Sequence, residues 1–90
     1  MVIDNVDLFK DNLAKLLASE LPYVVTIHKA TGYSKYYEWL EDTLGPKWVF
    51  AQRCGTWNII TKADTWANTY HYVVYFKYPE DATLFALRWP

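Results

Sequence analysis

Few residues in this chain are of the types that catalysis requires. The plausible nucleophile, base and orienting group are Cys54, His28 or His71, and Asp64. Nucleophilic catalysis needs these three groups in contact with one another. Only Arg53 stands beside Cys54 as a neighbour that favours a reactive thiolate, so a cysteine packed in a turn is the simpler interpretation. The sequence therefore predicts no catalytic residue.

Metal, cofactor and phosphate sites are not predicted either. The two histidines and the cysteine lack the C-x-x-C or H-x-x-x-H spacing of metal sites. The adjacent acids Glu41-Asp42 and Glu80-Asp81 point apart on a helix, so neither pair forms an acid/base dyad. The three glycines are scattered, and no glycine-rich loop precedes a helix. We expect no bound metal and no cofactor.

Length and charge set the protein class. Ninety residues suit one domain spanning 1–90, and a formal net charge of −1 provides no attraction for nucleic acid or an anionic membrane. A single cysteine excludes an internal disulfide and fits a reducing compartment. The first residues do not resemble a signal peptide, and no apolar run is long enough to span a membrane. These features predict a cytoplasmic protein.

Hydrophobic periodicity predicts seven elements. The helices span about residue 5 to Glu20, Ser34 to Leu44 with Ser34 as the N-cap, and Pro79 to Trp89. The strands span 23–29, 47–53, 57–62 and 69–78. Pro22 and Gly45-Pro46 end the first two helices. At the third, Pro79 and two carboxylates suit the first turn, and Arg88 suits the last.

The resulting order, α-β-α-β-β-β-α, predicts an α+β fold. The β-α-β unit at residues 23–53 should cross over right-handed, and the later hairpins should make the sheet mostly antiparallel. We expect a small layered sandwich, a ferredoxin-like variant with an extra leading helix and no closing strand.

Aromatic residues exceed what one helical layer can cover. Seventeen of the ninety side chains are aromatic: five Trp, eight Tyr and four Phe. In the strand 69–78, alternation places Tyr70, Tyr72, Val74, Phe76 and Tyr78 on a core face, and the opposite face remains largely apolar. Either the leading helix crosses to that second face, or a partner covers it. The interface candidates are Tyr75, His71 and Val73 on this face, Trp66 in its loop, and Leu84 and Leu87 on the last helix.

One segment has a family resemblance. Residues 76–89, Phe-Lys-Tyr-Pro-Glu-Asp-Ala-Thr-Leu-Phe-Ala-Leu-Arg-Trp, resemble the closing segment of small uncharacterised proteins encoded by tailed bacteriophages. There, an aromatic strand passes through an acidic turn into a helix that reads Asp-Ala-x-x-Phe-x-Leu-Arg/Lys-Trp. The resemblance covers less than a fifth of the chain and transfers no catalytic residue. It implies a phage protein of the host cytoplasm that binds a host or phage protein.

The leading functional hypothesis is a non-catalytic protein–protein interaction module that binds a partner protein or itself as a homodimer. An alternative is single-stranded nucleic-acid binding through stacking on Trp57, Tyr70, Tyr72 or Tyr75. Nucleic acid is a weaker candidate because the nine basic residues form no stripe. A further alternative is a small ligand-binding or enzyme domain with a cavity lined by Tyr33, Tyr37 or Trp39 and reached by His28.

Overall fold

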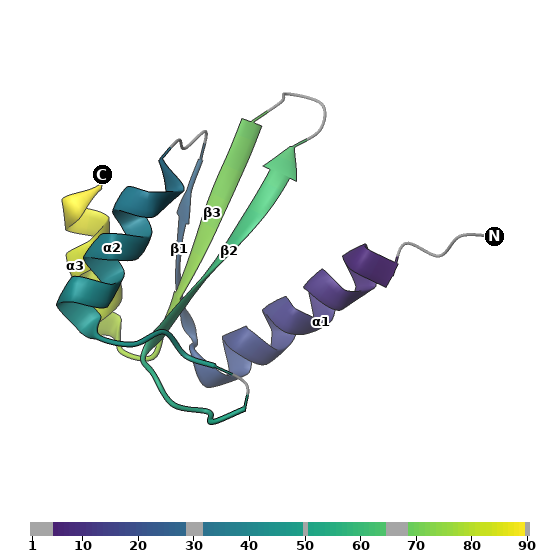
Figure 1. Cartoon of the computed structure of the whole chain (residues 1–90), viewed down its shortest axis with the longest axis horizontal. Coiled ribbons are helices and arrows are strands. Elements are labelled where there is room, and N and C mark those ends of the chain that lie inside the picture. Colours follow the sequence, from purple (N-terminus) through teal and green to yellow (C-terminus); the bar gives the residue numbers. More distant parts are fainter. Residues whose placement is uncertain (1–4, 29–31, 50, 65–68, 90) are drawn as a thin grey trace.

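A three-stranded antiparallel sheet carries helices on both faces (Figure 1). The structure is a computed structural model that describes residues 5–28, 32–49, 51–64 and 69–89, without the side chains of 5–12, 63–64 and 69–70. Within these residues the fold is mixed α+β, as predicted. The elements are α1 (Asn5–Glu20), β1 (Tyr23–Ile27), α2 (Tyr33–Leu44), β2 (Trp57–Asp64), β3 (Thr69–Phe76) and α3 (Pro79–Arg88).

The last strand in sequence lies in the middle of the sheet. The strand order is β1-β3-β2, and β3 is antiparallel to both neighbours. Val74, near the centre of β3, is paired with Val25 of β1 and with Ile59 of β2. Because both outer strands oppose β3, they run parallel to each other without touching. β1 and β2 are therefore the two edge strands.

Helices α2 and α3 cover one face of the sheet (Figure 1). Side chains alternate along a strand, so every second residue of β3 points to this face. The buried cluster there consists of Tyr36, Leu40, Trp57, Ile59, Tyr72, Val74, Phe76 and Phe85. The prediction of a core face on β3 is confirmed at Tyr72, Val74 and Phe76. It is wrong at Tyr78, which is 45% exposed because the strand ends at Phe76.

Helix α1 packs on the opposite face, and its N-terminal end projects away from the sheet (Figure 1). A second buried cluster contains Leu17 and Leu21, Trp48, Ile60, Val73 and Tyr75. The aromatic pattern predicted that either the leading helix or a partner covers this second face. The leading helix crosses to the second face.

The segment between α2 and β2 is not the predicted strand 47–53. Its described part forms one isolated bridge, between Val49 and Cys54. The regular alternation ends because Arg53 has φ 47° and Gly55 has φ 108°, both in the left-handed region. A Cβ at Gly55 would lie 2.5 Å from the Trp48 backbone nitrogen, so the chain approaches itself too closely there for any side chain. The order is α-β-α-β-β-α, and the predicted β-α-β unit at 23–53 is wrong.

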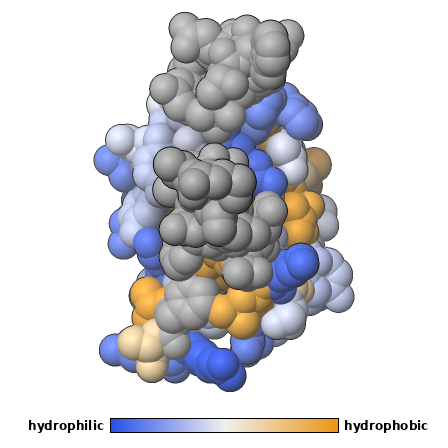
Figure 2. Space-filling model, turned by 90° about the vertical axis from the view of Figure 1, so that its right-hand side faces the viewer, coloured by the Kyte–Doolittle hydropathy of each residue, from blue (hydrophilic) through white to orange (hydrophobic). Residues whose placement is uncertain are grey.

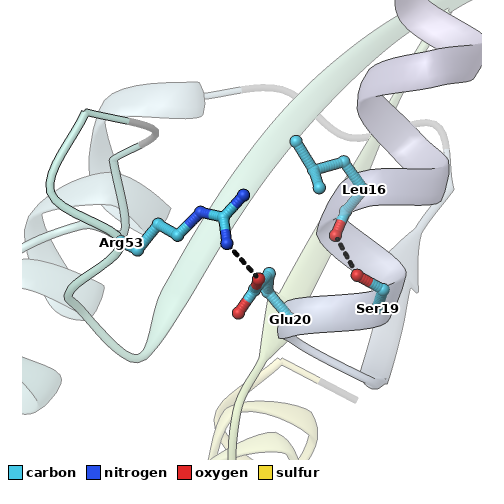
Figure 3. Close-up of polar contacts among 4 residues, drawn as sticks. All are labelled: Leu16, Ser19, Glu20 and Arg53. Carbon is cyan, nitrogen blue, oxygen red and sulfur yellow. Dashed lines mark hydrogen bonds and ion pairs between the residues drawn. The ribbon is translucent and has the colours of Figure 1, made fainter.

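This segment instead joins the two faces of the sheet. The Trp48 backbone N–H donates to the Trp57 carbonyl oxygen at 2.8 Å, and the Asn58 amide donates to the Trp48 carbonyl oxygen at 3.0 Å. These bonds hold the Trp48 ring in the cluster beneath α1. Arg53 also reaches the end of α1, with Nη1 3.8 Å from Oε1 of Glu20 (Figure 3).

The helix ends follow local chemistry with one exception. α3 begins at Pro79, has Glu80 and Asp81 in its first turn and Arg88 in its last, as predicted. α2 does not use Ser34 as its N-cap. Gly32 occupies that position at φ 81°, and its carbonyl oxygen accepts the Lys35 N–H at 3.1 Å. The N-cap therefore lies two residues earlier than the Ser34 pattern predicts, and the helix begins at Tyr33.

Candidate protein interface

Two of the predicted interface residues are buried within the single chain. Tyr75 is 5% exposed and Val73 is 8% exposed. Leu17 of α1, Leu21 directly after this helix and the Trp48 ring cover them in the second cluster. The expectation that these residues remain free on the second sheet face is therefore wrong, because α1 supplies the leucines that seal it.

Burial also affects the ionisation of Tyr75. Removal of the phenol from water raises its pKa above the ordinary value. The folded protein thus holds the Tyr75 proton more tightly than the unfolded chain does. This contribution to the free energy of unfolding is complete below about pH 10, the unfolded pKa, and is lost as the pH rises through the higher folded pKa.

Tyr75→Phe should therefore make the protein less sensitive to alkali. The free energy of unfolding of the wild type should fall more than that of the variant between about pH 8 and about pH 11. Urea unfolding at the two pH values measures this, with the exposed Tyr78→Phe as the matched control. An equal fall in the free energy of unfolding of the wild type and of Tyr75→Phe would show that ionisation of Tyr75 does not affect stability.

The third residue proposed on this face, His71, lies where β1 ends and β3 begins. His71 is half-buried and His28 is exposed. The two Nδ1 atoms are 3.3 Å apart, and the rings meet edge to face with centroids 5.0 Å apart. Sequence reasoning placed these histidines on separate elements and missed the pair. The β1–β3 register would have revealed the pair, because its last pair is Ile27↔Tyr72 and the two histidines come directly next on each strand's path.

The predicted residues on α3 are exposed. Leu84 is 46% exposed and Leu87 is 74% exposed, while Phe85 between them is fully buried. The two leucines line a groove of about 420 Å³, together with Pro79, Glu80 and Thr83. The prediction that α3 cannot bury all its large apolar side chains on one side is confirmed.

Further apolar exposure lies on β1, the edge strand that α3 contacts. Tyr23, 42% exposed, is paired with Phe76 and points to the face that α3 covers, whereas Val24, 47% exposed, is paired with Tyr75 and points to the opposite face. Figure 2 views the side from which α1 projects, where apolar and hydrophilic residues alternate in small patches. The β1 edge and the outer side of α3 are the elements on which exposed apolar residues concentrate.

A second groove, of about 330 Å³, runs along α2. It is lined by Tyr33, Ser34, Tyr37, Glu38 and Glu41. Burial raises the pKa of Tyr33, and the neighbouring Tyr37 and Tyr72 add to the effect. Trp39 packs instead against Phe85 and Trp89. His28 follows β1 on the face opposite α2, so it does not reach this groove as the ligand-binding alternative requires.

The candidate catalytic residues are not brought together. Cys54 precedes β2, whereas His71 is paired with Lys62, five residues beyond the start of that strand at Trp57. At about 3.3 Å per residue, the two are separated by about 16 Å or more along the sheet. The Cys54 thiol instead contacts the Gln52 side-chain oxygen at 3.5 Å. Within the described ranges, no group of three or more His, Cys, Asp or Glu residues is arranged to hold a metal ion.

The nucleic-acid alternative is not supported by exposed rings on the sheet. Trp57, Tyr72 and Tyr75 are 0%, 6% and 5% exposed. The Tyr70 side chain, and all of Trp66, lie outside the described residues. Base stacking needs accessible ring faces, and these three described rings are not accessible.

We compared the chain with models of protein families, with curated proteins and with solved structures, and none of the three comparisons found a match. In the part of the chain that the structure describes, no helix has the length and apolar character needed to cross a membrane.

Proposed function

We propose that this protein is a non-catalytic protein-binding module that uses the β1 edge and the outer side of α3. The observation that carries the proposal is the distribution of exposed large apolar residues. Seven are found in the part of the chain that the structure describes, and five of them belong to β1, to α3 or to the turn before α3: Tyr23, Val24, Tyr78, Leu84 and Leu87. Large exposed apolar residues that concentrate on a few elements of a soluble domain are typical of binding surfaces.

The free edge of β1 supplies the second half of the proposed interface. The order β-α-β-β-α from β1 to α3 supports the expected ferredoxin-like variant without a closing strand. In the complete arrangement, a strand after the last helix lies beside the first strand. Here that edge of β1 has no partner strand among the described residues, because the sheet order is β1-β3-β2. An added strand would gain backbone hydrogen bonds along β1 and apolar contacts with α3.

The partner is a protein rather than a polyanion. The net charge is −1, and the proposed surface is apolar with Glu80 beside it. The resemblance of residues 76–89 supports a phage-encoded protein of the host cytoplasm, with a host or phage protein as its partner. A second copy of this chain, pairing β1 with β1 about a two-fold axis, is the homodimer version.

Leu87→Glu should abolish binding while the domain stays folded. Leu87 is 74% exposed, so a charge there costs little in the free chain but would be buried unpaired in a complex. Affinity should fall at least 30-fold, since a central apolar contact is worth about 2 kcal/mol or more. Light scattering over a concentration series measures the homodimer, and pull-down from expressing cells measures another partner.

Ala86→Glu is the matched control, because Ala86 is an exposed neighbour on the same helix and lies outside the groove. Binding retained in both variants would contradict the proposed surface. A constant monomer mass at every concentration would remove the homodimer version and leave the other partner to be tested by pull-down.

A further inference from the structure

We propose that His28 and His71 form a binding site for one divalent transition-metal ion of the kind that imidazole favours, with Zn²⁺ as the best match. This proposal does not rest on the proposed protein interface. The two histidines lie on the opposite sheet face from α3, where β1 ends and β3 begins.

The sheet holds the two rings together. His28 and His71 are 43 residues apart in sequence, and each lies one position beyond the last β1–β3 pair, Ile27↔Tyr72, so the two side chains meet across these strands. Opposite residues of an antiparallel pair have Cβ atoms about 4.5–5.5 Å apart, so two imidazoles there can reach the same ion. Their Nδ1 atoms are the closest ring nitrogens given by the structure, at 3.3 Å.

The separation of 3.3 Å fits a tetrahedral ion. Zn–N bonds are about 2.0–2.1 Å long, so two nitrogens on a tetrahedral Zn²⁺ lie about 3.3–3.4 Å apart. In the metal-free pair, one Nδ1–H donates to the other Nδ1, whose lone pair accepts. Metal binding needs a lone pair on both Nδ1 atoms. The donor ring therefore loses its Nδ1 proton to solvent and takes one at Nε2, and the ion replaces the shared proton.

The chain supplies only part of the coordination shell. No group of three metal-ligating residues exists in the described part of the chain, so water or a ligand from another molecule would fill the remaining positions. Lys62 is paired with His71 on its other side, and its exposed ammonium group opposes the charge of the ion. This predicts moderate affinity that rises when the lysine charge is removed.

The test is titration of the untagged chain with ZnCl₂ by calorimetry. We expect one Zn²⁺ per chain, with at least a tenfold loss of affinity in His28→Ala and in His71→Ala. Lys62→Gln should bind at least as tightly as the wild type. Cys54→Ser is the control for the free thiol, and it should keep both stoichiometry and affinity. Mg²⁺, which prefers oxygen ligands, should not bind.

A second readout follows from the fold. The two ligands meet only when the sheet is formed, so Zn²⁺ should raise the thermal unfolding midpoint of the wild type and not of His71→Ala. Circular dichroism of each alanine variant checks that it is folded. The absence of saturable binding to the wild type, equal binding to His71→Ala, or binding lost in Cys54→Ser would each overturn the site.

Discussion

Phe85→Ala should destabilise the protein by about 3–5 kcal/mol, the cost of removing a buried phenylalanine and leaving a cavity. Phe85 is fully buried at the centre of the ring cluster between the two helices and the sheet. Its ring centroid lies 5.0–6.3 Å from four others, those of Trp89, Phe76, Trp39 and Tyr36. Rings at these distances are rigid, so they would not fill the space that the Phe85 ring leaves.

A small domain has a total stability of about 5–15 kcal/mol, so this one change removes a large part of it. Denaturant unfolding followed by both far-UV and near-UV circular dichroism would measure the loss. Leu84→Ala is the matched control on the same helix, since Leu84 is 46% exposed and its truncation should cost much less. Equal midpoints for the two variants would show that α3 does not anchor the first cluster.

Leu17→Ala should destabilise the protein by about 2–5 kcal/mol, which is typical of a buried leucine. Leu17 is fully buried on the side of α1 that covers Val73 and Tyr75. Its removal takes away the contact by which the leading helix seals the second sheet face. The variant should also expose Tyr75, which raises the tendency to self-associate.

Leu87→Ala provides the same substitution at a leucine that is 74% exposed, and its stability should change by less than about 0.5 kcal/mol. Urea unfolding compares the two, and light scattering follows association. If Leu17→Ala costs no more than Leu87→Ala, α1 does not seal the face, and Tyr75 and Val73 become interface candidates again.

Most of the helices and strands could be predicted from the sequence because their signals are local. The apolar period, Pro22 and the Gly45-Pro46 stop place α1 and α2, and Pro79 with its following acids starts α3. The failure at 47–53 has a tertiary cause. Trp48 leaves the expected strand to fill the space under α1, and the left-handed backbone at Arg53 and Gly55 permits this path.

The candidate surfaces divide in the same way. Exposure of Leu84 and Leu87 follows from the helical period alone, because one stripe of α3 cannot bury residues on its opposite side. Burial of Tyr75 and Val73 does not follow from any local pattern. It depends on α1, because Leu17 of this helix, which covers Val73 and Tyr75, is more than fifty positions away from them in sequence.

By itself, the sequence determined the three helices and the three strands of the sheet, the two-sided apolar character of β3 and the outward leucines of α3, since period and capping act over a few residues. Only the tertiary structure decided that β3 lies between β1 and β2, and that α1 covers the second face. The same strand order brings Nδ1 of His28 to 3.3 Å from Nδ1 of His71. Strand order and register depend on which apolar surfaces meet across the whole chain, and that is a property of packing rather than of neighbouring residues.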